Sequence, residues 1–219
     1  MHPWNRPQEP AELRTQRAAL TRAFVKKRRA TGKTPRCKWP KVRNATGELM
    51  TLQKLLAEHT GRHCNYCDNL MDYTGPKTID HFLPKSRFPC LVYVWSNLYL
   101  CCTYCQRKGT RYNKKALRPD ELGYSFSRYF RYHRDGTMSV VANDKTDQER
   151  AEITLRLLDL NDDEMVKDRR RAFMQHQVPR RRPLRAGLDS YTASLRDAVQ
   201  RPSFEDKPFR DFFSQEQES

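Results

Sequence analysis

Apolar side chains recur at helical spacing in two segments of the N-terminal third of the chain. Residues 11–30 predict a basic helix with one apolar face, formed by Leu13, Leu20 and Phe24. Residues 48–60 predict a second helix that ends before Gly61, with an apolar face formed by Leu49, Leu52, Leu55, Leu56 and His59. The stretch 31–47 contains two prolines and two glycines, which predict a loop between these helices.

The pattern changes to short β-like segments in the middle of the chain. Residues 77–82 and 97–100 predict two strands, because they are rich in β-branched, aromatic and other apolar side chains. Residues 102–114 predict a basic helix that begins at a cysteine. The predicted order is therefore strand, loop, strand and helix.

The C-terminal half returns to helical periodicity after one hairpin. Residues 129–142 predict a β-hairpin that turns at an Asp-Gly pair. Helices are predicted over 146–158 and 161–177, each with a capping-box pattern at its first residue. A linker rich in arginine and proline follows, then a last helix over 188–199 and a tail that holds four phenylalanines from residue 203 onward.

Basic residues are concentrated in three blocks. The 219-residue chain has 42 Lys and Arg against 26 Asp and Glu, a net charge of +16. Residues 11–43, 106–118 and 165–185 carry net charges of +11, +6 and +7, so the remainder is mildly acidic. This distribution is typical of a protein that binds nucleic acid. Anionic membranes, acidic proteins and solvated helix faces remain open as alternatives on charge alone.

The apolar content excludes two broad classes. Hydrophobic residues make up 37% of the chain, which is enough for a core, and the longest apolar run, residues 91–95, is too short to span a bilayer. The chain does not open with the charged and apolar regions of a secretory signal. We therefore expect a cytoplasmic protein that neither crosses nor is exported through a membrane.

The spacing of the cysteines predicts a metal site. Two C-x2-C pairs, Cys64 with Cys67 and Cys102 with Cys105, are separated by 34 residues. Two such knuckles supply four thiolates for a tetrahedral, structural Zn²⁺ site. Buried thiols or a redox pair are the alternatives. Three cysteines, Cys37, Cys90 and Cys101, are left over and are interpreted as small apolar residues, although Cys101 could compete with Cys102 and His63 could replace a cysteine ligand.

The segment between the knuckles carries the chemically active residues. Asp80 and His81 stand near the end of the first predicted strand, and zinc at the knuckles would hold the following strand and helix beside them. A carboxylate and an amide oxygen suit Mg²⁺, and a neighbouring imidazole can take a proton from water. This is the minimum set for metal-assisted hydrolysis of a phosphodiester. An isolated Asp-His pair is otherwise ordinary polar surface.

Four spaced motifs together resemble the HNH nucleases, which have a ββα-metal core. They are Cys-x2-Cys at 64–67, Ile-Asp-His-Phe-x-Pro-Lys-Ser at 79–86, Trp-x-Asn-Leu at 95–98 and Cys-x2-Cys-Gln-x-Lys at 102–108. The chain is most similar to the PtuB-like HNH component of Septu-type and retron-linked anti-phage systems. The core motif covers about residues 62–112, and the likeness extends to the start of the chain and to residues 128–169.

The resemblance implies a role for each matching residue. His81 matches the general base that activates water, Asp80 matches the acidic ligand of a catalytic Mg²⁺ or Mn²⁺, and Asn97 matches the residue that orients the histidine through the intervening loop. The four knuckle cysteines match structural zinc ligands. Phosphate contacts are implied more weakly, for Lys85, Arg107 and Lys108. Gln106 departs from the family, which has Asn or His as the second metal ligand at this position, and its side chain is one methylene longer than that of Asn.

The sequence therefore predicts an α+β protein with a zinc-stapled ββα-metal core and flanking helices. We expect a basic helical region at 1–61, the nuclease core at 62–115, a hairpin and helices at 116–202 and a tail at 203–219. The predicted function is metal-dependent endonuclease action on DNA or RNA. The resemblance implies a PtuA-like ATPase partner, and since the chain has no Walker A motif, any ATP dependence would have to come from that partner. The alternatives are a stand-alone, restriction-like HNH endonuclease and a zinc-stapled binding or assembly module without catalysis.

Several other residues have two interpretations. Trp95 is more simply a core residue than a platform for stacking bases. The arginine triplets at 169–171 and 180–182 are either partner or phosphate contacts or solvated helix faces. The phenylalanines of the tail are either an anchor for a partner protein or part of an irregular extension.

Overall fold

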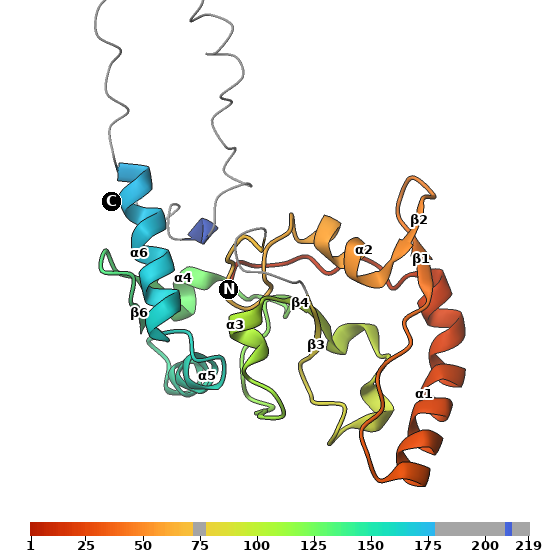
Figure 1. Cartoon of the computed structure of the whole chain (residues 1–219). Helices are drawn as coiled ribbons and strands as arrows, with labels where there is room; N and C mark the ends of the chain where they lie inside the picture. The colour runs from red at the N-terminus through yellow and green to blue at the C-terminus, as the bar shows by residue number, and fades with distance from the viewer. Residues whose placement is uncertain (72–77, 178–208, 212–219) are drawn as a thin grey trace, which may run out of the picture.

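The computed structural model describes residues 1–71, 78–177 and 209–211. Its helices and strands are, in chain order, α1 (Ala11–Thr31), β1 (Lys41–Arg43), β2 (Leu49–Thr51), α2 (Leu52–His59), β3 (Thr78–His81), β4 (Leu98–Cys101), α3 (Thr103–Gln106), α4 (Phe126–Tyr129), β5 (Phe130–Tyr132), β6 (Met138–Val140), α5 (Lys145–Leu157) and α6 (Asp163–Gln177). The described strands form three antiparallel pairs. Figure 1 shows β3 and β4 between an N-terminal group, α1 to α2, and a C-terminal group, α4 to α6. The predicted α+β class is confirmed.

The central pair holds the segment that the motifs singled out. Strand β3 pairs with β4 so that Asp80 lies opposite Tyr99 and His81 lies opposite Leu98. All four residues of β4 are buried, which places this strand in the core. Both predicted strands are confirmed, with one shift: Asn97 ends a short 3-10 helix, Trp95–Asn97, and precedes β4.

The helix that follows β4 is much shorter than predicted. α3 has four residues and ends at Gln106, so the expectation of a helix to residue 114 is wrong. Gly109 has φ +58°, a left-handed conformation that interrupts a right-handed helix. The basic residues after α3 therefore occupy turns, and their side chains project in different directions.

The N-terminal group departs from the prediction at its second helix. α1 is confirmed, with Leu13 and Phe24 buried and Gly32 as a left-handed cap. The predicted loop contains β1, and the first residues of the predicted second helix form β2, which pairs with β1. Leu49 is consequently exposed rather than buried. Thr51 then caps α2, because its side chain accepts a hydrogen bond from the backbone N–H of Lys54.

The C-terminal group confirms the hairpin and both helices but not their caps. Asp144, and not Thr146, caps α5 by accepting from two backbone N–H groups. Asn161 hydrogen bonds to the backbone of Met138 in β6 instead of capping α6. The hairpin turn contains Gly136 at φ +90°, and a Cβ there would lie 2.1 Å from the carbonyl oxygen of Val166. The turn therefore packs directly on the backbone of α6. The short helix α4 was not predicted.

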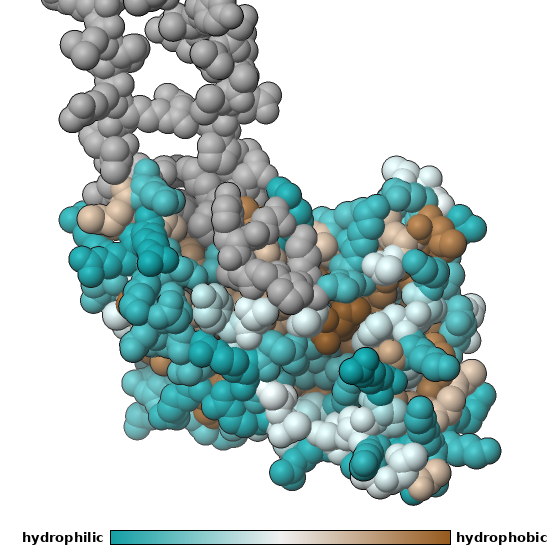
Figure 2. Space-filling model, viewed as in Figure 1, coloured by the Kyte–Doolittle hydropathy of each residue, from teal (hydrophilic) through white to brown (hydrophobic). Residues whose placement is uncertain are grey.

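Part of the predicted C-terminal organisation lies outside the described residues. This applies to the linker, the last helix over 188–199 and three of the four tail phenylalanines. The fourth, Phe209, is buried, and its backbone N–H bonds to the carbonyl of Asp68 in the first knuckle. Within the described residues, no helix has the length and apolar character needed to cross a membrane. The face seen in Figure 2 is mostly hydrophilic over α5 and α6.

Candidate functional site

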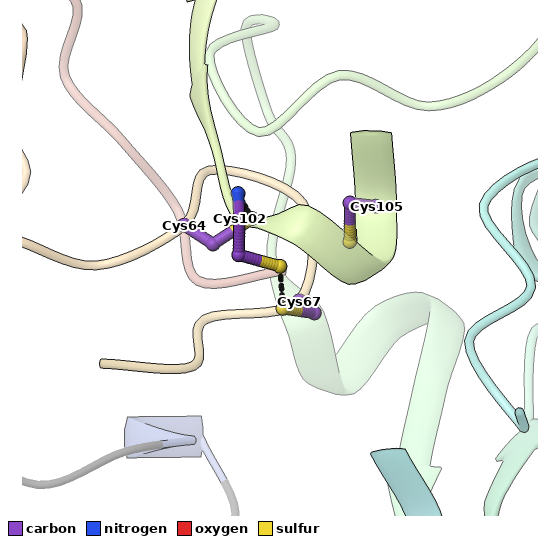
Figure 3. Close-up of side chains that lie close together, drawn as sticks. All are labelled: Cys64, Cys67, Cys102 and Cys105. Atoms are coloured by element: carbon purple, nitrogen blue, oxygen red, sulfur yellow. Dashed lines mark hydrogen bonds between the residues drawn. The ribbon is translucent and has the colours of Figure 1, made fainter. Parts of the chain in front are cut away.

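Four cysteines from two distant segments converge on one point. The sulfur atoms of Cys64, Cys67, Cys102 and Cys105 all lie within 4.8 Å of one another, and all four residues are buried (Figure 3). The Sγ atoms of Cys67 and Cys102 are 3.6 Å apart. Zinc–sulfur bonds of about 2.3 Å in a tetrahedron separate the sulfurs by about 3.8 Å. The four cysteines therefore fit a closed zinc site.

The thiols of the cluster also affect one another's protonation. Burial raises the pKa of Cys64, but hydrogen bonds from its cysteine neighbours outweigh burial and lower this pKa well below its usual value. The pKa values of Cys67 and Cys105 are raised well above normal, first by hydrogen bonding to Cys102. These buried thiols therefore influence one another's ionisation, and a cation at the centre would favour the thiolate form.

The first knuckle also fixes strand β4 in place. The backbone N–H of Asn65 bonds to the carbonyl of Leu100, and the Asn65 side chain accepts from the N–H of Leu100 at 2.8 Å. The backbone N–H of Cys102 bonds to the sulfur of Cys64. Cys101 lies outside the four-sulfur group, and its thiol donates to the carbonyl of Cys102. The cluster therefore holds the end of β4 and the start of α3 against the knuckle.

His81 is fixed in one orientation at the end of β3. Its Nε2 lies 2.9 Å from the carbonyl oxygen of Val92, and because a carbonyl only accepts, this nitrogen carries the proton. The structure shows no hydrogen-bond partner for Nδ1 among the described residues. Burial, with smaller effects from Lys85 and Lys108, lowers the pKa of His81 to about 4. The imidazole is therefore neutral at pH 7, with Nδ1 able to accept a proton.

Asn97 holds together the loop that carries the partner of His81. Its Oδ1 accepts from the backbone N–H of Leu83 at 2.8 Å. Its Nδ2 donates to the carbonyl oxygens of Leu83 and Leu91, at 3.0 and 3.2 Å. Leu91 immediately precedes Val92, so Asn97 positions the carbonyl that orients His81.

Asp80 is buried and bound on one oxygen by two donors. The hydroxyl of Tyr66 donates to Oδ2 at 2.7 Å, and the ammonium of Lys108 lies 3.1 Å from the same atom. Burial raises the pKa of Asp80, while Lys108 and Tyr66 act in the opposite direction. Tyr66 belongs to the first knuckle, so the cysteine cluster and the carboxylate share a structural support.

Gln106 faces the same strand as Asp80. Its Oε1 accepts a hydrogen bond from the Thr78 hydroxyl at 2.5 Å. Thr78 and Asp80 are two residues apart on β3, so their side chains leave the same face of the strand. A carboxylate and an amide oxygen on one face are hard donors that suit Mg²⁺ or Mn²⁺. The donor types fit such an ion, and Lys108 already neutralises the only carboxylate of this set.

A segment of the N-terminal region covers the histidine. The indole of Trp39 stacks on the His81 ring, with centroids 5.9 Å apart and planes inclined by 24°. Two further contacts hold this segment: the backbone N–H of Lys38 bonds to the hydroxyl of Tyr93, and the Lys85 ammonium lies 3.5 Å from the sulfur of Cys37. His81 is consequently only 6% exposed.

A second group of possible metal ligands lies beside the first knuckle. Side-chain atoms of His2, Asp68 and Asp211 lie within 4.8 Å of one another. The carboxylate of Asp68, however, already accepts from the guanidinium and the backbone N–H of Arg210. This arrangement attaches residues 209–211 to the knuckle by a buried ion pair.

The remaining residues that the sequence singled out lie in different surroundings. Arg107 pairs with Asp162 at 2.8 Å and is half exposed. Trp95 is a core residue, and its indole N–H donates to the carbonyl of Pro7. Cys37 is half-buried and Cys90 is exposed, so treating all three left-over cysteines as apolar residues is wrong for Cys90.

Sequence reasoning missed three residues at the site: Tyr66, Trp39 and Val92. Tyr66 could have been considered, because a residue between two clustered cysteines is held close to the segments that they join. Trp39 lies 42 positions before His81, and no local pattern connects the two. Val92 acts through its backbone carbonyl, which no sequence motif records.

Comparison with known proteins gives one informative match. No family model matches the chain. The chain is similar to the Septu protein PtuB of Bacillus thuringiensis, with 30% identity over 112 residues. The matched region is 50% of this chain and 38% of PtuB, so the chain spans well under half of this curated relative. The match supports a relationship to a Septu component.

Proposed function

We propose that this chain is a metal-dependent endonuclease of the HNH type, with β3, β4 and α3 as its ββα-metal core. The observation that carries the proposal is the state of His81: its ring is fixed through Nε2 and neutral, with Nδ1 available, beside Asp80. The similarity to PtuB adds independent support. The domain boundaries given above remain predictions.

In the proposed reaction, His81 acts on water. Nδ1 takes a proton from a water molecule, and the oxygen forms a bond to phosphorus while the bond to the 3′ oxygen breaks. The 3′ oxygen then gains a proton, which leaves a 5′-phosphate. The hydrogen bond to Val92 keeps the imidazole in the required tautomer, and Asn97 maintains that hydrogen bond through the loop.

We propose two metals in two places, on the basis of the donor types. The four cysteines would hold structural Zn²⁺, and Asp80 with Gln106 would hold Mg²⁺ or Mn²⁺. A divalent ion supplies stabilisation of the negative charge that develops on the phosphate oxygens. Lys85, Arg107 and Lys108 remain candidates for contacts with phosphate, although Arg107 and Lys108 each have an acidic partner in the structure.

The exposed face of α1 supports nucleic acid as the substrate. Leu13 and Phe24 are buried on one side of the helix. Three cations, Arg22, Lys26 and Arg29, are exposed at positions i, i+4 and i+7 on the other side. Residues at this spacing share one helix face, and a row of cations suits a phosphate backbone.

The similarity to PtuB suggests a defence complex. We propose that the chain acts with a PtuA-like ATPase, because the family that the motifs resemble includes such a partner. A stand-alone, restriction-like enzyme would cut nucleic acid without it.

One observation favours a binding module without catalysis. Lys108 neutralises Asp80, and Gln106 bonds to Thr78, so the oxygen donors expected at a catalytic metal are both engaged within the chain. Such a module would keep the zinc site and the basic surfaces.

The deciding experiment is a cleavage assay with Mg²⁺ or Mn²⁺ on plasmid, single-stranded DNA and tRNA. The zinc-loaded chain is tested alone and with a PtuA-like ATPase. We expect His81→Ala to reduce cleavage about 10²- to 10⁴-fold, the usual range for loss of a general base. His133→Ala, at an exposed hairpin histidine, serves as the matched control and should cut normally.

Each result selects one interpretation. Cleavage only with the ATPase supports the defence complex, and cleavage by the chain alone supports the stand-alone enzyme. Equal cleavage by His81→Ala and His133→Ala would contradict the proposed role of His81. Nucleic-acid binding without any cleavage supports the binding module.

A further inference from the structure

Lys108 is almost completely buried. Its side chain is 1% exposed, and its ammonium lies 3.1 Å from Asp80 Oδ2 and 3.2 Å from the carbonyl oxygen of His81. Lysine is rarely buried unless its charge is paired. The pairing is reinforced by the backbone, because the N–H of Lys108 bonds to the carbonyl of Cys105 in the cysteine cluster. The segment that carries Cys105 therefore positions the Lys108 ammonium beside Asp80.

The two donors on Asp80 occupy the same oxygen. A carboxylate oxygen has two lone-pair positions, and Oδ2 accepts from both the Tyr66 hydroxyl and the Lys108 ammonium. Tyr66 is fully buried inside the first knuckle, which leaves it little room to move away. A metal ion that binds through Oδ2 must therefore replace the ammonium of Lys108.

Charge leads to the same conclusion. Asp80 and Lys108 neutralise each other, so the pair offers no net negative charge to a cation. An ammonium group and a divalent ion at adjacent positions repel each other strongly in a buried site. A metal ion that binds beside an unmoved Lys108 would therefore bind more weakly.

We propose that Lys108 is a built-in competitor for the divalent cation at Asp80. Binding of Mg²⁺ or Mn²⁺ displaces the Lys108 ammonium from the carboxylate, and the metal affinity of the chain is set by that exchange. The proposal rests on the proposed function only in assigning a divalent ion to Asp80. It makes Lys108 a residue that acts through Asp80 and sets the cation concentration at which the site is loaded.

Mn²⁺ binding to the zinc-loaded full-length chain tests this directly. Free Mn²⁺ is measured by electron paramagnetic resonance for the wild type, Lys108→Met and Lys108→Arg. We expect Lys108→Met to bind Mn²⁺ at least about tenfold more tightly, whereas Lys108→Arg, which keeps the charge, stays close to the wild type. Lys114→Met is the matched control, because it removes one positive charge from an exposed position in the same part of the chain. Asp80→Asn should abolish the high-affinity site in every background.

An affinity for Mn²⁺ in Lys108→Met no tighter than in Lys114→Met overturns the proposal, as does tight wild-type binding that Asp80→Asn leaves intact. A purely structural role of Lys108 would weaken binding in both Lys108 variants, and this result also overturns it. The readout is binding and not cleavage. A chain that shows the expected affinities but cuts nothing would retain the competition and refute only the nuclease.

A second measurement avoids substitution, in case Lys108→Met does not fold. A buried, paired ammonium exchanges its protons slowly enough to give a ¹⁵N–¹H signal in nuclear magnetic resonance spectra. We expect the Lys108 signal of the wild-type chain to shift or disappear as Mg²⁺ is added, and to be unaffected by an equal ionic strength of KCl. A Lys108 signal that is unchanged when Mg²⁺ is in large excess over the protein contradicts the exchange.

Discussion

The cysteine cluster and the proposed cation site at Asp80 are neighbouring groups of donors built in opposite ways. The cluster gathers four identical donors, two from each of two knuckles, and their sulfurs converge on one point. Asp80 stands alone as a carboxylate, and two groups of the chain itself already bind its Oδ2. The two sites nevertheless share supports, since Tyr66 and Lys108 both extend from segments that carry ligand cysteines.

This difference leads us to expect that the fold depends on a metal at the cysteine cluster but not on a metal at Asp80. Four buried thiols ionise together only when a cation neutralises them, so we expect the fold around the knuckles to depend on a bound metal such as zinc. Asp80 is neutralised by Lys108 whether or not a divalent ion is present. Loss of zinc should therefore remove structure, whereas loss of Mg²⁺ or Mn²⁺ should leave the fold intact.

The largest effect should come from breaking the cluster. We expect Cys67→Ser to lose the zinc ion and most of the cooperative unfolding transition, since structural zinc contributes on the order of 10 kcal/mol of apparent binding free energy. Zinc content by mass spectrometry and thermal unfolding by circular dichroism measure this. Cys90→Ser, at the exposed cysteine, is the matched control and should behave as the wild type. Full zinc content in Cys67→Ser would exclude the cluster as the zinc site.

A smaller effect should follow from loosening the loop beside Asp80 without touching a metal ligand. Asn97→Ala removes three hydrogen bonds to the backbone of Leu83 and Leu91 and should cost about 2–4 kcal/mol, because buried polar groups lose their partners. Denaturant unfolding measures this cost, with the exposed Asn5→Ala as control. Zinc content should not change. An Asn97→Ala chain as stable as Asn5→Ala would mean that the loop is held by other contacts.

The smallest effect concerns the cover over His81. Because burial is the main cause of the lowered pKa of His81, we expect Trp39→Ala to raise this pKa from about 4 toward the ordinary value near 6.5. The folded wild type binds fewer protons than the unfolded chain below pH 6.5, so its stability falls as the pH drops through this window. Nuclear magnetic resonance titration between pH 8 and 5 should show His81 titrating only in Trp39→Ala. Trp4→Ala, at another half-buried indole, should leave His81 unchanged, and identical titration curves for both variants would contradict the prediction.

The same contrast explains what the sequence could predict. The cysteine cluster follows from spacing alone. Strand β3, which carries Asp80, and strand β4, which directly follows Asn97, follow from local residue type. The state of Asp80 does not, because it depends on Lys108, which a charge count treats as a surface residue. The burial of Lys108 results from the early end of α3, which Gly109 and the geometry of the knuckle determine. The pairing of β1 with β2 was missed for a related reason: tertiary pairing outweighed the helical period of residues 48–51.

The stack of Trp39 on His81 has a consequence for how tightly a substrate can bind. Under the proposed function, we expect the buried His81, which is 6% exposed, to meet water and substrate only in molecules in which the indole has moved aside. The apparent dissociation constant is then the intrinsic one divided by the fraction of open molecules. An opening free energy of about 2.7 kcal/mol leaves roughly one molecule in a hundred open and weakens apparent affinity about 100-fold. A partner that binds only the open population would recover that factor without contacting the substrate.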